Sequence, residues 1–143
     1  MPVHQREDPL PAFRFRVYRG TRALPQVTEA SGLVLEGRNP AFGQPDPKKP
    51  DLPSGPGVVL RRGVTQDKGF WDWFCQAQSD PALKDDVRIV LMDKDGRDAV
   101  VWMLEGAYPV RWSGPDLKAD CSAVAFESLE LRFDRIRWES PGL

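Results

Sequence analysis

The stretch Arg61-Arg62-Gly63-Val64-Thr65-Gln66-Asp67-Lys68-Gly69-Phe70-Trp71-Asp72-Trp73-Phe74-Cys75 decides the fold, because it joins the end of a strand to the start of an aromatic-rich helix. Thr65 or Asp67 can accept hydrogen bonds from the free backbone N–H groups of the first helical turn. Apolar side chains at positions 70, 73, 74 and 77 fit one helical face, and Ser79-Asp80-Pro81 ends the helix. The rest of the chain has β-type patterns, so we expect only one substantial helix.

Trp71 lies well off the apolar face of this predicted helix. One interpretation is that Trp71 packs under a neighbouring loop of the same chain. The other is that it contacts a second subunit, because Trp is enriched at the buried centres of protein interfaces. The helix alone leaves both interpretations open.

Length and charge limit the class of protein. With 143 residues the chain fits one domain, 1–143, large enough to bury a core without disulfides or metals. Its 20 Lys and Arg residues against 21 Asp and Glu residues give no broad basic surface for nucleic acid or anionic lipid. We expect no membrane binding, because no apolar run approaches the ~20 residues of a spanning helix. Residues 1–15 lack the apolar core of a signal peptide, which predicts synthesis in the cytoplasm without export by that route.

Catalytic and metal-binding residues are scarce. The single histidine, His4, lies in a terminal segment, which leaves no Ser-His-Asp or Cys-His arrangement in the folded body. Cys75 and Cys121 are expected to be buried free thiols. The sequence therefore predicts neither an enzyme nor a protein with a metal or another cofactor.

Several segments alternate between apolar and polar residues, as half-buried strands do. Asp95-Gly96 lies between two of them and predicts a hairpin. A proline in the segment 107–112 favours an edge strand or a strand's beginning there. The predicted strands are 13–18, 27–38, 57–62, 86–92, 99–104, 107–112 and 122–133.

The last predicted strand has two faces. Residues 123, 125, 129, 131 and 133 are apolar, whereas Ser128, Glu130 and Arg132 lie on the opposite face. Glu127 falls on the apolar face, so it either pairs with a cation or marks where that face leaves the core. Past Asp134 the apolar positions become even-numbered, which predicts a bulge or a change of strand partner.

Residues 39–57 form a Pro-rich segment with prolines at 40, 45, 47, 50, 53 and 56. A connection of this length is functional or disordered in most compact domains. A surface insertion and an arm that becomes ordered against a partner are equally compatible with the composition. The whole pattern predicts a mainly β fold: an antiparallel β-sandwich or barrel of about seven strands with one helix and a long extended arm.

The chain resembles the tail-tube proteins of contractile-tailed phages and of phage-tail-like contractile injection systems. The resemblance covers nearly the whole chain from Asp8 onward and depends on the combination of motifs in order. The matching segments are Asp8-Pro9, 13–17, 28–33, 60–65, Trp71-Asp72-Trp73, Val101-Trp102, 107–117 and 125–131.

The resemblance implies a structural subunit of an inner tube, in which hexameric rings share their β-structure, stack, and carry protein effectors or phage DNA through a lumen. It implies sheath and baseplate proteins as partners, and residence in an assembled particle after synthesis. In such tubes an arm between early strands reaches an adjacent ring, and 39–57 occupies that place. Because the arm lacks the family's usual Gly-rich pattern, a specialised ring near the baseplate is an alternative to the bulk tube.

Candidate contact residues follow from this resemblance together with the residue patterns. The subunit interface is expected to include Trp71 and, from the arm, Pro45, Pro47, Pro50 and Leu52. Ser128, Glu130 and Arg132 are expected to face the lumen, with Arg14 and Arg16 as a second candidate pair. The alternative function, on architecture alone, is a monomeric β-barrel that binds a small ligand.

Overall fold

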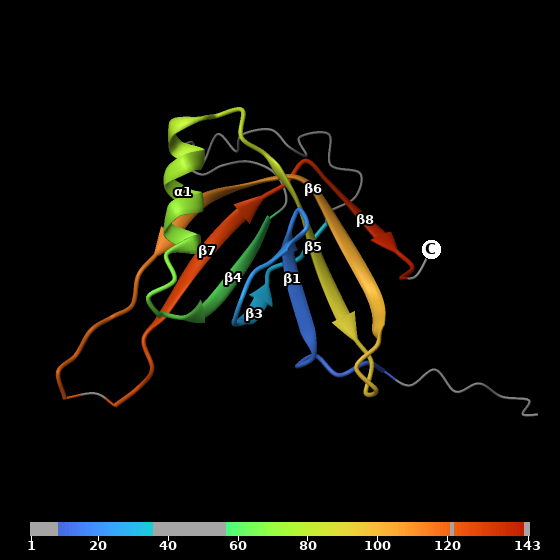
Figure 1. The fold of residues 1–143 in the computed structure, drawn as a ribbon, viewed down its shortest axis with the longest axis horizontal. Helices are drawn as coiled ribbons and strands as arrows, with labels where there is room; N and C mark the ends of the chain where they lie inside the picture. The colour runs from blue at the N-terminus through green and yellow to red at the C-terminus, as the bar shows by residue number, and fades with distance from the viewer. Residues whose placement is uncertain (1–8, 36–56, 121, 142–143) are drawn as a thin grey trace, which may run out of the picture.

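The structure is a computed structural model that describes residues 9–35, 57–120 and 122–141 (Figure 1). Within these ranges one helix lies beside an antiparallel sheet of eight strands. The elements are β1 (Phe15–Arg19), β2 (Arg22–Ala23), β3 (Val27–Ser31), β4 (Gly57–Gly63), α1 (Gly69–Ser79), β5 (Asp85–Met92), β6 (Asp98–Ser113), β7 (Phe126–Arg132) and β8 (Arg135–Glu139). The predicted mainly β fold with one helix is confirmed.

The strand order is β2-β1-β5-β6-β7-β4-β3, and β8 pairs with β6. One edge of β6 pairs with β5, whereas the other edge pairs with β7 near its end and with β8 nearer its start. The sheet curves into a barrel-like shape that does not close completely (Figure 1). Among the described residues, the outer edge of β8 has no strand partner.

The separate strand predicted at 107–112 is wrong, because these residues belong to the 16-residue strand β6. Gly106 adopts a φ of 67°, which favours glycine, and the pairing of β6 with β7 shifts register between Pro109 and Arg111. Pro109 is buried inside the strand, not at its beginning. It has no N–H to donate, and the register shift accommodates this.

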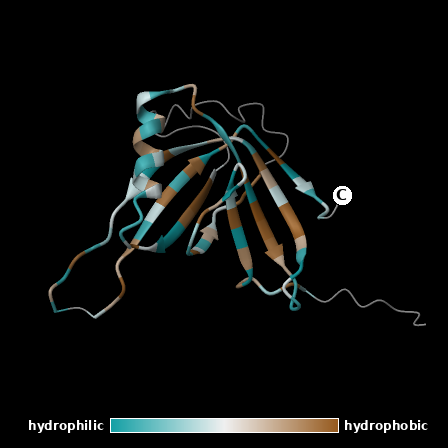
Figure 2. Ribbon diagram, viewed as in Figure 1, coloured by the Kyte–Doolittle hydropathy of each residue, from teal (hydrophilic) through white to brown (hydrophobic). Residues whose placement is uncertain are grey.

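The hairpin predicted at Asp95-Gly96 is confirmed, with β5 pairing β6 and Gly96 at a φ of 81°. The two faces of the last long strand are confirmed as well, because every second residue of β7 is buried. Past Asp134 the chain continues as β8, which pairs with an earlier part of β6 than β7 does and, unlike β7, not with β4. Figure 2 shows the resulting apolar and polar bands along the strands.

The core lies between the sheet and the helix, which packs against β6 and β7. Phe70 and Trp73 are fully buried from the helix. Arg19 stacks 4.5 Å over the Trp73 ring and pairs with Asp85 at 3.1 Å. The buried cluster consists of Val17, Val58, Leu60, Phe70, Trp73, Val87, Ile89, Leu104, Ala107, Leu129, Leu131 and Phe133.

Helix α1 ends where the sequence predicts, whereas its N-cap is neither Thr65 nor Asp67. The Asp67 carboxylate accepts a hydrogen bond of 2.7 Å from the Gly69 N–H, and Lys68 is the N-cap residue without a side-chain capping bond. Thr65 accepts a bond from the Asp67 N–H and so supports the turn before the helix without capping it. The last helical residue is Ser79, followed by Asp80-Pro81.

Candidate functional site

Arg62, on β4, connects the sheet to the start of the helix. Its guanidinium is 3% exposed and its Nε donates to Glu127 of β7 at 3.2 Å. It also donates to the Asp67 carboxylate at 3.4 Å and to the Pro25 carbonyl at 3.4 Å. The cation lies 4.1 Å from the centre of the Phe70 ring, a distance at which cation and ring attract each other. Arg62 therefore fixes the helix start relative to β4, β7 and the β2–β3 turn.

Glu127 is the second member of this buried pair and is only 6% exposed. One of its oxygens accepts from Arg62, and the other accepts from the Trp112 indole N–H at 2.9 Å. The acidic residue on the apolar face therefore pairs with a cation, which is one of the two outcomes the sequence left open. Because both carboxylate oxygens are satisfied, the charge is tolerated in the interior.

Trp112, held by its hydrogen bond to Glu127, in turn contacts the helix. Its ring meets the Trp71 ring edge-to-face, with centroids 4.9 Å apart and an interplanar angle of 79°. Trp71 thus has a partner within its own chain, yet 43% of it stays exposed. The Trp71–Trp112 pair is consequently a partly exposed aromatic surface, in which Trp112 is held by its hydrogen bond to Glu127.

Cys75 lies on the exposed side of the helix as a free thiol, so the expectation that it is buried is wrong. It lies four residues after Trp71, one helical turn further along the same side, away from Phe70 and Trp73. Cys121 falls outside the described residues.

The predicted lumen residues lie on strands at different places in the sheet. Ser128, Glu130 and Arg132 share the outward face of β7, where Arg132 pairs with Glu130 at 3.3 Å. Their side chains are partly buried, 17% exposed for Arg132 and 23% for Glu130. Arg16 is exposed on β1, and Arg14 donates to the Lys94 carbonyl at 3.0 Å. Because β5 and β6 separate β1 from β7, these residues do not form one cluster.

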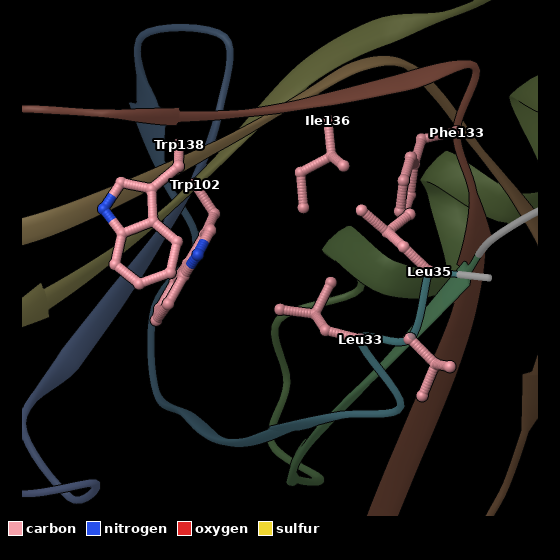
Figure 3. Close-up of a pocket in the computed structure, with 7 residues that line it drawn as sticks. Leu33, Leu35, Trp102, Phe133, Ile136 and Trp138 are labelled. Carbon is pink, nitrogen blue, oxygen red and sulfur yellow. The ribbon is translucent and has the colours of Figure 1, made fainter. Parts of the chain in front are cut away.

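An apolar pocket of about 500 Å³ lies on the face of β8 that carries Ile136 and Trp138 (Figure 3). The chain just after β3 forms one wall, and β6, β8 and the residue after β7 form the rest. Its lining residues include Leu33, Leu35, Trp102, Phe133, Ile136 and Trp138. Trp138 meets Trp102 edge-to-face at 5.3 Å, and 72% of Trp138 is exposed.

Sequence reasoning missed this pocket and the role of Trp112. The apolar run Leu33-Val34-Leu35 and the parity of Ile136 and Trp138 were visible signals. They come together only because β8 folds back along β6. The predicted arm residues Pro45, Pro47, Pro50 and Leu52 lie outside the described residues.

The described ranges contain no group of three or more His, Cys, Asp or Glu side chains placed to bind a metal ion. In the same ranges, no helix has the length and hydrophobicity that a membrane span requires.

A family model for the T4-like virus tail tube protein gp19 matches residues 11–137. The chain belongs to this tail tube family. Proteins of the family are structural tube subunits, and the resemblance seen in the sequence is thereby confirmed. A comparison with curated proteins finds no match.

Solved structures share the tail tube fold. A chain of the PVC sheath–tube complex, from an extracellular contractile injection system in its extended state, is 24% identical, with a TM-score of 0.76 over 94% of this chain and 93% of its own. A chain from the terminating cap of the anti-feeding prophage tube is 25% identical, with a TM-score of 0.78 over 97% and 96%. Hcp1 from Flavobacterium johnsoniae is 12% identical, with a TM-score of 0.59 over 90% and 96%.

Proposed function

We propose that this tail tube protein acts as one domain, 1–143, and forms the inner tube of a contractile injection particle as stacked hexameric rings around a lumen. The observation that carries the proposal is the family match, which extends over residues 11–137. Likeness in fold to a chain of a sheath–tube complex supports the same assignment, because it covers 94% of this chain.

The exposed surfaces support assembly with other subunits. The Trp71–Trp112 pair leaves Trp71 43% exposed, Trp138 on β8 is 72% exposed, and among the described residues the outer edge of β8 has no strand partner. Free sheet edges are sites where another chain can pair, and exposed aromatic groups are typical interface anchors. We propose Trp71 as an inter-subunit contact, and the arm residues Pro45, Pro47, Pro50 and Leu52 as a second contact between rings.

The outward face of β7 is our proposed lumen surface. Ser128, Glu130 and Arg132 give it charges of both signs that neutralise one another, so the wall would not hold cargo of either sign strongly. Arg16 on β1 and Arg14, the residue before β1, are proposed as further lumen residues. A protein effector or phage DNA is the proposed cargo, and sheath and baseplate proteins are the proposed partners.

The composition of residues 39–57 supports a more specific position in the particle. The Pro-rich segment departs from the family's usual arm, so we propose a specialised ring near the baseplate. A chain of the anti-feeding prophage baseplate shares the fold, with a TM-score of 0.66 at 21% identity.

The test is electron microscopy of the purified protein over a range of concentrations, combined with sedimentation velocity. Six-membered rings or stacked tubes are the expected result. A small monomer at every concentration, with no rings in the images, would refute the tube assignment and favour the ligand-binding alternative.

A further inference from the structure

Another cavity, about 370 Å³ in volume, lies where β4, β6 and β7 meet the segments that leave β6 and enter β7 (Figure 1). We call it the β4–β7 cleft. Unlike the pocket at β8, this cleft is lined by charged and hydroxyl side chains as well as apolar ones. Its lining residues include Val59, Arg61, Ser113, Asp116, Phe126 and Ser128.

Strand pairing places Arg61 beside two hydroxyl groups. Arg61 of β4 lies opposite Ser128 of β7, and Ser128 lies opposite Ser113 of β6. Residues that lie opposite one another in neighbouring strands share a face, with their Cβ atoms about 4.5–5.5 Å apart. The three side chains therefore form a row on the outward face of β7, which is the proposed lumen surface.

The Arg61 guanidinium is held in place but not neutralised. It lies 4.2 Å from the centre of the Phe126 ring, and this stacking orients its plane and leaves the edge with its N–H donors available. Glu29 of β3 lies opposite Arg61, yet Arg61 forms no ion pair with any residue that the structure describes. The cleft thus presents an oriented cation without a bound acceptor.

These donors suit a carboxylate. The two parallel N–H groups of a guanidinium match the two oxygens of a carboxylate, and a serine hydroxyl can donate a further hydrogen bond. The situation differs at Arg132 on the same face, because Arg132 pairs with Glu130 at 3.3 Å. Arg61 is consequently a place on the proposed lumen surface where a negative group of another molecule can bind.

The charges around the cleft favour a protein ligand over a nucleic acid. Asp116 lines the cleft and Glu29 lies opposite Arg61, so the local surface is not broadly basic. Nucleic acids bind through many contacts between cations and phosphates, which one arginine beside two acidic residues does not provide. A protein chain can place one carboxylate at Arg61 and a neighbouring N–H group at Asp116.

We propose that the β4–β7 cleft binds an exposed Asp or Glu side chain of a protein cargo, with Arg61 as the residue that binds the carboxylate. The inference rests on the proposed tube function and selects a protein effector from the two proposed classes of cargo. Each contact is weak, because Arg61 is exposed to water. Repetition of the cleft around a ring and along stacked rings adds several such contacts to one cargo molecule.

A labelled peptide of six glutamates tests the cleft, with its binding followed by fluorescence anisotropy at low salt. A peptide of six glutamines is the control ligand. Arg61→Gln is expected to weaken binding of the glutamate peptide about tenfold or more, because a charge-assisted hydrogen bond is lost. Arg61→Lys should give a smaller loss, since it keeps the charge without the planar fork.

Arg111→Gln is the matched control variant. Arg111 is exposed and lies opposite Glu130 on the same face, but it does not line the cleft, so binding should change little. Asp116→Asn should strengthen binding, because it removes a charge of the same sign as the peptide. Equal losses for Arg61→Gln and Arg111→Gln would overturn the cleft as the binding site.

Two further ligands test the class and the place of the cargo. A short DNA strand that binds more tightly than the glutamate peptide, and does so through Arg61, would overturn the assignment to protein cargo. A glutamate peptide coupled to a large polymer should bind unassembled protein but not assembled tubes. Binding of this polymer to both would place the cleft outside the lumen and overturn its role in cargo binding.

Micrographs of the same samples separate this inference from the tube function. Rings or tubes without binding that depends on Arg61 would overturn the cleft and leave the tube function standing. Binding through Arg61 by a protein that never forms rings would refute the tube function and, with it, the role of the cleft in cargo binding. Absence of both rings and binding would refute both.

Discussion

Replacing Glu127 by leucine should destabilise the protein far more than the same change at Glu130. Glu127 and its partner Arg62 are 6% and 3% exposed, so Glu127→Leu leaves a buried cation without its main counter-charge. It also removes the acceptor of the Trp112 indole N–H, which lies 2.9 Å from Glu127. Removing one member of a buried ion pair costs about 3–5 kcal/mol, a large part of a typical free energy of unfolding.

Glu130→Leu is the matched control, because Glu130 lies on the same strand and also pairs with an arginine. Its ion pair with Arg132 is more exposed, at 23% and 17%, and it lies on the outward face. Because this pair is only partly buried, water screens it more than the Arg62–Glu127 pair, so we expect a smaller loss of stability.

The assay is urea unfolding of unassembled protein, followed by tryptophan fluorescence. With a slope of about 1–3 kcal/mol per molar, Glu127→Leu should lower the midpoint by more than about 1 M. The double variant Arg62→Met with Glu127→Leu should recover most of the loss, because it removes both buried charges. Equal losses at Glu127 and Glu130 would refute the assignment of Arg62 and Glu127 as the pair that holds the helix to the sheet.

Three further predictions use other parts of the structure. Trp71→Ala should lower unfolding stability less than the about 3–5 kcal/mol typical of replacing a buried aromatic residue by alanine, because Trp71 is 43% exposed. It should nevertheless impair ring formation strongly. A variant that unfolds as a monomer would instead assign Trp71 to the core. Gly106→Ala should lower the free energy of unfolding, measured in urea, more than Gly96→Ala does. Both glycines have a positive φ, but only at position 106 would the added methyl group clash with the Asp134 carboxylate. Equal losses would contradict this. In assembled tubes of a variant without native cysteines, Ser128→Cys should react with a small maleimide but not with a polymer-linked one; reaction with both would place residue 128 outside the lumen.

The sequence indicated the local elements because their signals repeat over short distances. The alternation along β7 predicted its buried face, Asp95-Gly96 predicted the β5–β6 turn, and the apolar positions of α1 predicted Phe70 and Trp73 in the core. The prediction at 107–112 failed because a proline inside a strand usually marks an edge, whereas here a register shift accommodates Pro109.

The tertiary structure decided which distant residues meet. The sequence left open whether Glu127 pairs with a cation or marks where its face leaves the core, and strand pairing of β4 with β7 brought it to Arg62, 65 residues away. The exposed indole of Trp71 was visible from helical spacing, but its contact with Trp112 depends on how α1 lies on β6. The pocket at β8 likewise joins residues 33–35 to residues 133–138.

The sequence predicted local elements better than contacts between distant residues because the two depend on interactions of different range along the chain. Side-chain periodicity is set by the backbone of one element, so a single sequence determines which residues of a strand or helix can be buried. Pairing, register and the contacts across a core depend on elements far apart in the chain, and many arrangements satisfy the same local pattern. For this tail tube protein the sequence by itself determined most of the elements, the buried faces of α1 and β7, and the position of Trp71 off the apolar face of the helix. Only the tertiary structure decided that Trp112 contacts Trp71 and that an apolar pocket forms at β8.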